Sequence, residues 1–338
     1  MSTNHHKENY TSGNKVSVIL SFRNEEDVLP ELIKRLRQTL ISEKIKKVIA
    51  AYELVFVNDV STDRSLEILL SELQNHKDIK IINMSRNFGV SPCVLAGMKY
   101  ATGNILVYMD ADLQDPPELI PEMLNAYKKM GVDVVHTQRT SRDGESKIKL
   151  AITKLGYSIL KKVSTIDIAP NIGDFKLLSR RAADHLIQLK EHRPFIRGLI
   201  NWIGFKQTTI KYKREKRFAG ETKFPIFSAK VIGNFFNSAL ISFSDMPLKL
   251  ISLVGFLVSM GAFAYSIWVM INKFLGHNIP GWSALMVAIL FLGGLNLLAM
   301  GILGLYINSI FIETKRRPNF IVESTFGFDK NNQANANN

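Results

Sequence analysis

Residues 104–118 read NILVYMDADLQDPPE, and this stretch decides how the rest of the chain is interpreted. A run of mostly apolar residues, typical of a buried strand, is followed by three aspartates and a glutamine within six positions, and then by two prolines. An acidic loop after a strand is common, and the prolines would then simply break the chain before a helix. The other interpretation is a site for a divalent metal.

Apolar runs and helical stretches alternate through the first part of the chain. The helical stretches include residues 30–40, 65–73 and 93–100. The apolar runs are VSVILSF (16–22), ELVFVND (53–59), IKIINM (79–84), NILVYMD (104–110) and VDVVHTQR (132–139). Strands bounded by helices predict an α/β fold with a mainly parallel sheet and helices on both of its faces.

Polar side chains stand at the carboxyl ends of the first four predicted strands. They are Asn24 and Glu25, Asn58 and Asp59, Arg86 and Asn87, and Asp110 to Gln114. In sheets of this kind, ligands bind beyond the carboxyl ends of the strands. The four strand ends therefore predict one cleft.

The type of ligand follows from which motifs are present. The chain has no GxGxxG after its first strand and no GxxxxGK[ST], so neither a dinucleotide-binding fold nor a P-loop is indicated. Magnesium is usually held by one or two carboxylates and completed by ligand phosphates. The sequence DADLQ at a strand end suits a divalent ion bound to a nucleoside diphosphate.

Positive charge is concentrated in the middle of the chain. The net charge is +13, and residues 142–230 alone carry 20 Lys and Arg against 8 Asp and Glu, a net of +12. Such a segment can bind nucleic acid, anionic lipid or phosphate. Two membrane spans follow it, which disfavours nucleic acid as the partner.

The two predicted spans are uncharged runs from Leu250 to Ile271 and from Ser283 to Ile312. About 20 apolar residues cross a bilayer as a helix. Buried helices of a soluble core would show polar faces, and these runs do not. Basic residues flank the outer ends, at Lys249 and again at 315–317, so both termini are expected in the cytoplasm of a multi-pass cell-membrane protein.

The remaining segments complete the expected domain organisation. The N-terminus lacks the apolar core of a signal peptide, and the single Cys93 excludes an intrachain disulfide. Apolar residues at helical spacing after Pro225 predict an amphipathic helix in the membrane interface, with a core helix of the globular domain as the alternative. The expected parts are a disordered arm (1–14), the globular domain (15–224), the interfacial helix region (225–246), a two-helix transmembrane hairpin (247–312) and a cytoplasmic tail (313–338).

Several segments carry a resemblance to a known family. They are SFRNEE, VNDVSTDRS, SRNFG, DADLQDPPELI, APNIGDFKLLSRR, RPFIRGLINWIGF, REKRFAGETKF and ETKRRPNF. The chain resembles inverting family 2 glycosyltransferases of the polyprenyl-phosphate branch, alongside bactoprenol-phosphate glucosyltransferases and dolichol-phosphate mannose synthases. This resemblance covers roughly residues 15–322 and implies a GT-A type nucleotide-sugar-binding domain. Ser21, Asn58, Val60 and Arg64 depart from the usual family pattern on the nucleobase side.

The resemblance also implies roles for individual residues. Asp59 and Asp110 should contact the donor nucleoside, and the residues expected beside them are Asn24, Glu25 and Arg86. Asp112 and Gln114 should hold Mg²⁺ or Mn²⁺ against the donor diphosphate. Asp174 should line the sugar site, although Gly173-Asp174 is also compatible with a helix cap.

A phosphate clamp is expected from the basic segment. Its predicted members are Arg139, Arg142, Arg214, Arg217 and Lys223. Arg214 and Arg217 are three residues apart and precede Gly220, so a short turn could aim both at one anion. The alternative is a basic surface attracted to anionic headgroups. Asp112, Asp174 and Arg217 are the expected catalytic residues.

The resulting hypothesis is an enzyme that moves a monosaccharide, with glucose from UDP-glucose as the expected case, to a polyprenyl phosphate. A processive polysaccharide synthase usually carries a QxxRW segment and more spans, and this chain has neither. A non-catalytic membrane scaffold built on the same fold is the second alternative. Small residues in the spans, such as Gly293 and Gly301, would permit a homo-oligomer, but glycine is also simply tolerated in membrane helices.

Overall fold

The computed structural model describes residues 14–140, 172–189, 191, 194–213, 246–275 and 281–328. The strands are β1 (Lys15–Phe22), β2 (Ala51–Asn58), β3 (Ile79–Met84), β4 (Ile105–Asp110), β5 (Val134–Arg139), β6 (Ile172–Ser179), β7 (Gln207–Tyr212) and β8 (Val322–Phe326). The helices are α1 (Leu29–Ile45), α2 (Ser65–Asn75), α3 (Val90–Tyr100), α4 (Ile120–Met130), α6 (Arg180–Gln188), α7 (Ile196–Trp202), α9 (Met246–Phe274) and α10 (Trp282–Thr314), with a 3₁₀ turn at Pro117–Leu119. The predicted arm (1–14) and interfacial helix (225–246) lie almost entirely outside the described residues.

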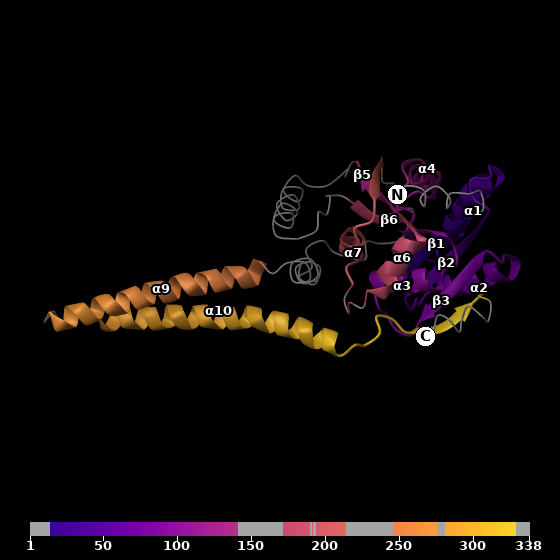
Figure 1. Cartoon of the computed structure of the whole chain (residues 1–338). Helices are drawn as coiled ribbons and strands as arrows, with labels where there is room; N and C mark the ends of the chain where they lie inside the picture. Colours follow the sequence, from indigo (N-terminus) through magenta and orange to yellow (C-terminus); the bar gives the residue numbers. More distant parts are fainter. Residues whose placement is uncertain are drawn as a thin grey trace.

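The described strands form one sheet in the order β7-β5-β6-β4-β1-β2-β3-β8 (Figure 1). β4, β1, β2 and β3 are parallel neighbours, and β5 pairs in parallel with β7. β6 is antiparallel to β4 and β5, and β8 is antiparallel to β3. The prediction of a mainly parallel sheet is confirmed.

The apolar runs form strands because both of their faces are covered. Along β1, Val18 and Leu20 belong to the core beneath α1, α2 and α4, while Ile19 between them belongs to the core beneath α3, α6 and α7. All three side chains are fully buried. Two helical layers on one sheet explain why these strands are continuous apolar runs without polar alternation.

Three strands, β6, β7 and β8, were not expected from the sequence. The largest consequence concerns the C-terminal segment, which was expected to be a tail from residue 313 onward. Residues Val322–Phe326 instead pair with β3 as the edge strand β8, so the chain returns from α10 to the globular domain. Sequence patterning indicated no strand here because the segment is short and half polar.

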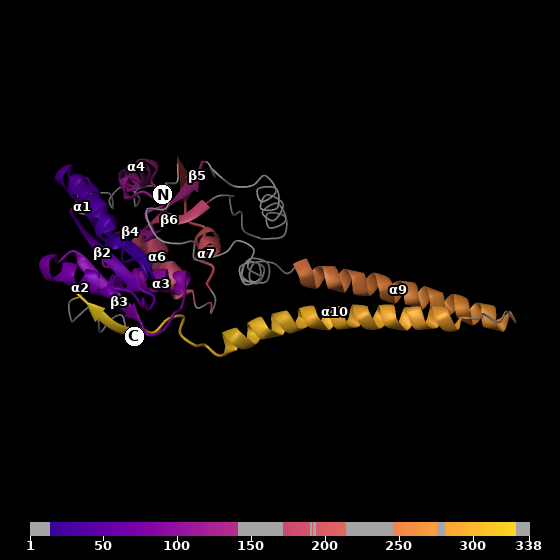
Figure 2. The ribbon, with the colours of Figure 1, turned by 180° about the vertical axis from the view of Figure 1, so that it is seen from behind.

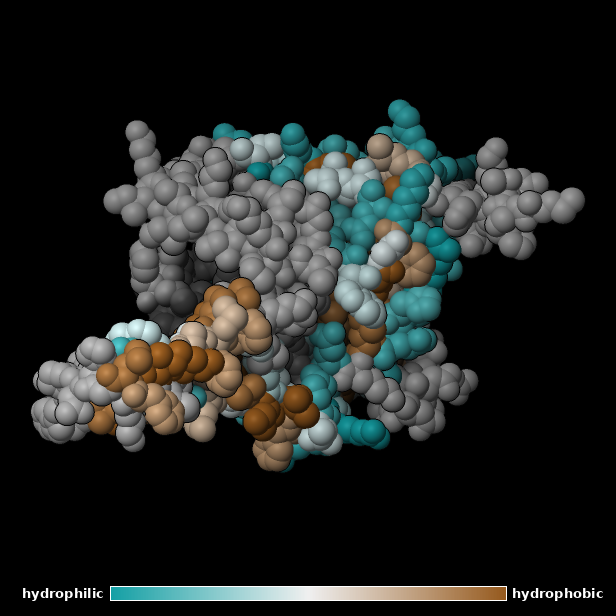
Figure 3. Space-filling model, turned by 60° about the vertical axis from the view of Figure 1, so that its left-hand side comes forward, coloured by the Kyte–Doolittle hydropathy of each residue, from teal (hydrophilic) through white to brown (hydrophobic). Residues whose placement is uncertain are grey.

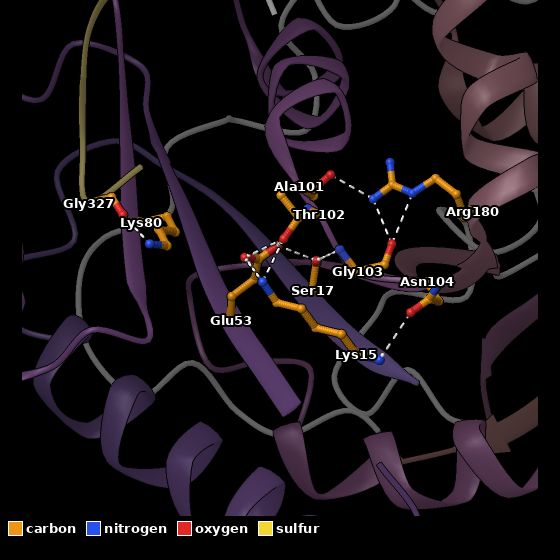
Figure 4. Close-up of polar contacts among 10 residues, drawn as sticks. All are labelled: Lys15, Ser17, Glu53, Lys80, Ala101, Thr102, Gly103, Asn104, Arg180 and Gly327. Atoms are coloured by element: carbon orange, nitrogen blue, oxygen red, sulfur yellow. Dashed lines mark hydrogen bonds and ion pairs between the residues drawn. The ribbon is translucent and has the colours of Figure 1, made fainter. Parts of the chain in front are cut away.

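A polar network joins the strands at their amino ends (Figure 4). The buried carboxylate of Glu53 accepts hydrogen bonds from Lys15 Nζ and Ser17 Oγ, each at 2.6 Å, and from the Thr102 backbone N–H at 2.7 Å. Arg180, at the start of α6, donates to the carbonyl oxygens of Ala101 and Gly103. These bonds fix β1, β2 and the segment before β4 at the edge of the sheet that lies away from the predicted cleft.

The helices α9 and α10 run side by side and extend away from the α/β domain (Figures 1 and 2). Their described surfaces are largely apolar, in contrast to the hydrophilic surface of the domain (Figure 3). Within α10, the stretch Phe291–Thr314 is long and apolar enough to cross a membrane. The corresponding stretch of α9 is the shorter Ile251–Tyr265, so the second predicted span stays a prediction.

Candidate active site

The ends of several strands meet at one edge of the sheet, which we call the carboxyl edge. β1 to β4 run in the same direction, and β5 shares it because β6 is antiparallel to both β4 and β5. For the same reason, β6 begins at this edge. Every described residue that the sequence assigned to the site lies at this edge or in a loop that directly follows it.

Four carboxylates influence one another at the ends of β4 and β6: Asp110, Asp112, Asp115 and Asp174. Burial, together with the negative charges of Asp174, Asp112 and Asp115, raises the pKa of Asp110 to about 7. Like charges disfavour ionisation of a carboxyl group. The carboxyl edge therefore carries a concentration of negative charge that a cation would relieve.

The loop after β4 holds the two predicted metal ligands in one turn. Asp112 is buried, and its Oδ1 accepts a hydrogen bond from the Gln114 backbone N–H at 3.1 Å. Leu113 between them has a left-handed backbone, with φ of 54°. Among the described residues, no group of three His, Cys, Asp or Glu side chains is arranged to hold a metal by itself. A cation here would need further ligands, which phosphate oxygens of a bound nucleotide can provide.

Asp174 is the third residue of β6, so the helix-cap alternative for Gly173-Asp174 is wrong. Arg197, on α7, donates from Nε to Asp174 Oδ1 at 2.7 Å and from Nη2 to Oδ2. Burial raises the pKa of Asp174, but the hydrogen bonds and charge of Arg197, together with the charges of Lys176 and Arg139, lower it below its ordinary value. Asp174 is therefore held ionised and in a fixed orientation.

Arg139 lies in a buried cluster with Asp115 and Tyr212. Asp115 is fully buried and accepts a hydrogen bond from the Tyr212 hydroxyl, and Arg139 Nη2 lies 3.6 Å from Asp115 Oδ2. A Cβ atom at Gly173 would lie 3.1 Å from Arg139 Nη2, so a larger residue here would require the guanidinium to move by a few tenths of an ångström. Burial and the charge of Asp115 raise the pKa of Tyr212 to about 12. The cluster accounts for the position of Arg139, whose role in a phosphate clamp stays a prediction.

On the side predicted for the nucleoside, Asp59 organises the loop after β3. Its two carboxylate oxygens accept from the backbone N–H groups of Phe88 at 2.7 Å and Gly89 at 3.0 Å, directly before α3. The Arg86 guanidinium stacks over the Phe88 ring, 4.0 Å from its centroid. Asp59 thus places the Arg86 loop beside the end of β2.

The loops after β1 and β2 are also joined. Asn24 Oδ1 accepts from the Thr62 backbone N–H at 2.7 Å, and the Asn24 backbone N–H donates to Ser61 Oγ at 3.0 Å. The Glu25 backbone N–H donates to Ser65 Oγ at 2.9 Å. Asn24, Glu25, Asp59 and Arg86, which were predicted from separate strand ends, therefore belong to one connected set of loops.

Comparison with known proteins agrees with this geometry. The sequence pattern described as Glycosyl transferase family 2 matches residues 17–187, which include the loop after β4 and all of β6. This chain belongs to Glycosyl transferase family 2. The glycosyltransferase YkcC of Bacillus subtilis is 43% identical over 93% of this chain and 94% of its own length. The prophage bactoprenol glucosyl transferase homolog of Escherichia coli is 33% identical over 91% and 98%, and the bactoprenol glucosyl transferase of Shigella phage SfX is 32% identical over 92% and 99%.

In this family 2 glycosyltransferase, a row of buried polar side chains lies beside the carboxylates. Across neighbouring strands, Lys176 of β6 lies opposite Tyr108 of β4 and His136 of β5. Lys176 Nζ, Tyr108 Oη and His136 Nδ1 are buried and have no hydrogen-bond partner within the described part of the chain. Burial lowers the pKa of Lys176 to about 7 and that of His136 to about 4.

Sequence reasoning did not assign Asp115, Lys176, Arg197 or Tyr212 to the site of this glycosyltransferase. Asp115 and Arg197 lie in segments that carry the family resemblance, so the only available signal was a charged residue within a matching segment. Lys176 also lies in such a segment, but its importance depends on the pairing of β6 with β4, which the sequence did not indicate.

Four of the predicted phosphate ligands, Arg142, Arg214, Arg217 and Lys223, lie outside the described residues. The chain leaves the described part after Thr140 and after Lys213, which directly follow β5 and β7 at the carboxyl edge. A cavity of about 510 Å³ lies at the opposite edge, and it contains none of the predicted site residues. Its lining is Lys128, Lys129, Gly131, Asp133, Arg181, Gly204, Phe205 and Lys206.

Proposed function

We propose that this family 2 glycosyltransferase moves one monosaccharide from a nucleoside diphosphate sugar, with UDP-glucose as the expected donor, to a polyprenyl phosphate. The reaction inverts the anomeric carbon. The observation that carries the proposal is one of position: the carboxylate cluster and the return from α10 share one edge of the sheet. β8 begins at that edge, where Val322 pairs with Met84, eight residues after the end of α10 at Thr314. A lipid phosphate at the membrane surface would thus approach the edge of the sheet that carries Asp110 and Asp174.

The acceptor class draws support from the relatives. Two of them are named for the transfer of glucose to bactoprenol, and each aligns with this chain over nearly its whole length. If the relatives aligned with the α/β domain alone, the alignment would not indicate a lipid as the acceptor. Here the alignment extends through the apolar helices as well, which supports a polyprenyl phosphate as the acceptor.

We also propose that both α9 and α10 cross the membrane. They contain 29 and 33 residues, respectively. At about 1.5 Å per residue, each is longer than the roughly 30 Å hydrocarbon core. Basic residues at the outer ends, Lys249 and 315–317, favour a cytoplasmic position for both termini and the α/β domain. Protease added to intact cells should then spare the domain, whereas inverted vesicles should lose it; cleavage from outside would contradict this topology.

The acceptor needs little chemical activation. A phosphate monoester has a second pKa near 6, so its oxygen is largely ionised at neutral pH. Catalysis can therefore rest on positioning and charge compensation. Asp174, held by Arg197, would orient the sugar, and Arg139 would contribute positive charge together with Arg142, Arg214, Arg217 and Lys223. The concentration of basic residues in 142–230 suits the entry of an anionic lipid headgroup.

A divalent cation fits the residues present. Asp112 and Gln114 share one turn, and the negative charges of Asp174, Asp112 and Asp115 act on the buried Asp110 beside it. Asp112 and Gln114 would hold Mg²⁺ or Mn²⁺, which would supply positive charge against the departing diphosphate. The turn at Leu113 keeps Asp112 and Gln114 two positions apart on one short loop.

The test is a product analysis. The purified full-length protein, in vesicles that contain polyprenyl phosphate, is incubated with radiolabelled UDP-glucose and Mg²⁺. We expect one labelled product that partitions with lipid and releases a single glucose on mild acid hydrolysis. A polymeric product would favour the processive synthase. No product with any of UDP-glucose, UDP-N-acetylglucosamine or GDP-mannose would favour the non-catalytic scaffold and overturn the proposal.

A further inference from the structure

The C-terminal strand β8 is firmly attached to the domain along its whole length. Before it, the carbonyl oxygen of Ile321 accepts from the Ser85 backbone N–H at 3.0 Å. After it, the carbonyl oxygen of Gly327 accepts from Lys80 Nζ (Figure 4), and the Phe328 ring packs edge-on against Tyr100. A segment that served only as a tail would not require contacts at both of its ends.

From β8, a chain of side-chain hydrogen bonds runs along the carboxyl edge. Asn83 Nδ2 donates to Ser324 Oγ at 3.2 Å, and Asn58 Nδ2 donates to Asn83 Oδ1 at 3.0 Å. Asn58 Oδ1 then accepts from the Ser61 backbone N–H at 2.9 Å. Asn58 and Asn83 are both buried, so the bond between them is shielded from water, whereas the bonds to Ser324 and from Ser61 are partly buried. Each amide donates one bond and accepts another, which connects Ser324 to the turn after β2.

That turn is strained and must be held by its surroundings. Val60 has φ of 56°, a left-handed conformation that β-branched residues rarely adopt. Such residues persist only where neighbouring contacts fix them. The bond from Ser61 to Asn58 spans Val60, and Asn58 is in turn fixed by Asn83. The hydrogen bonds from β8 therefore end at the strained turn.

The strained turn determines where the loops of the proposed donor site lie. Asp59, directly before Val60, holds the loop that carries Arg86 through its bonds to the Phe88 and Gly89 backbone. Ser61 and Thr62, directly after it, hold the loop that carries Asn24. A displacement of this turn would move both loops together.

We propose that β8 is a positioning element of the donor site, acting through Ser324, Asn83 and Asn58 on the turn at Val60. The inference rests on the proposed function for the identity of the donor. β8 itself lies on the far side of β3 from β2 and need not touch the nucleotide. Donor affinity would thus depend on the strand that follows the apolar helices.

Ser324→Ala in the full-length protein tests the proposal. One neutral hydrogen bond corresponds to a factor of about three to ten in an equilibrium constant. We expect KM for UDP-glucose, and Kd for UDP by calorimetry, to rise by about that factor, with kcat and the melting temperature near those of wild type. Ser324→Thr keeps the hydroxyl and should restore both constants. Glu323→Gln, at an exposed position of the same strand, is the matched control and should change neither.

A second variant tests whether the residues act in series. Asn83→Leu removes the middle of the connection, so adding Ser324→Ala to it should raise KM no further. Wild-type KM and Kd in Ser324→Ala, or a full additional effect in the double variant, would overturn the inference. If the wild-type protein transfers no sugar but binds UDP, the proposed function fails, while the UDP measurements still test the positioning role.

Discussion

The guanidinium of Arg197 donates to both carboxylate oxygens of Asp174, and the two residues come from different elements, α7 and β6. A bidentate pair fixes the plane of the carboxylate as well as its charge. The same pair lowers the pKa of Asp174 against the opposing effect of burial. Arg197 therefore sets both the direction and the ionisation of the residue that we place at the sugar.

Replacement of Arg197 by lysine should impair turnover more than stability. Lysine keeps the positive charge but lacks the planar fork. We expect kcat to fall about tenfold, the effect of roughly 1.4 kcal/mol in the transition state, with little change in the melting temperature. Because Asp174 loses part of what lowers its pKa, the acidic limb of the kcat/KM profile should move to higher pH.

The matched control for this variant is Arg181→Lys. Arg181 also forms a bidentate pair, with Asp133 at 2.6 and 2.5 Å, but at the opposite edge of the sheet. Its replacement should leave both the rate and the pH profile unchanged. An equal loss of turnover in the two variants would show that general disruption of ion pairs, and not the orientation of Asp174, is responsible.

Lys176→Met should separate stability from activity. Lys176 is fully buried, and its Nζ has no hydrogen-bond partner among the described residues. A buried ammonium group without a hydrogen-bond partner lowers stability, and an apolar side chain of similar length removes that cost. We expect an unchanged or higher melting temperature. Turnover should nevertheless fall, because the charge of Lys176 helps to keep Asp174 ionised.

The measurement for Lys176→Met is thermal unfolding together with a pH profile of kcat/KM. Removal of a cation raises the pKa of Asp174, so the acidic limb should again move to higher pH. Lys34→Met, at an exposed position on α1, serves as the control. A variant that is less stable and has an unshifted profile would mean that Lys176 has only a packing role.

Glu53 should contribute to stability and not to catalysis. Burial raises its pKa, but hydrogen bonds from Lys15, Ser17 and Thr102 lower it below the ordinary value. A group with a lowered folded-state pKa stabilises the fold above its unfolded pKa of about 4.3, and this contribution is lost as the pH falls through the folded pKa. Glu53→Gln should cost about 1–3 kcal/mol at pH 7.

Melting curves between pH 7 and pH 3 test this assignment. The wild-type melting temperature should fall more steeply with decreasing pH than that of Glu53→Gln, because only the wild type loses the ionised carboxylate. The kcat of Glu53→Gln should match wild type, since the network lies at the amino ends of the strands. A parallel decline in both proteins would show that other carboxylates cause the acid sensitivity.

The sequence predicted the parallel part of the sheet because its strands are local, continuous apolar runs with polar residues at their ends. Asp110, Asp59 and Asn24 could be assigned to one edge by that pattern alone. The antiparallel strands were missed for a physical reason. β6 carries Asp174 and Lys176 on a strand whose residues pair with β4 from 68 to 74 positions away, and β8 pairs with β3 from 238 to 245 positions away. No local pattern encodes either pairing.

The same reason explains which site residues were missed. Asp174 was singled out from the sequence, but its partner Arg197 lies 23 residues further on and on a different element. Tyr212 reaches Asp115 only because β7 lies beside β5. Partners that are brought together by strand order become visible only in three dimensions.

Activity should require a divalent cation held by Asp112. The Asp112 carboxylate has two separable roles: Oδ1 accepts from the Gln114 backbone N–H, and the negative charge would bind the ion. Asp112→Asn keeps an oxygen for the backbone bond but removes the charge, whereas Asp112→Ala removes both. If the negative charge of Asp112 is what binds the ion, kcat should fall by at least about 100-fold in both variants, because a metal supplies several kcal/mol of charge stabilisation.

Excess EDTA should abolish the wild-type activity, and added Mg²⁺ or Mn²⁺ should restore it. Binding of Mn²⁺ in the presence of UDP, followed by electron paramagnetic resonance, should weaken in both variants even where no turnover can be measured. Asp184→Asn, in the exposed i,i+4 pair with Arg180 on α6, is the control and should retain both metal binding and activity. Full activity in EDTA, or in Asp112→Ala, would rule out this metal site.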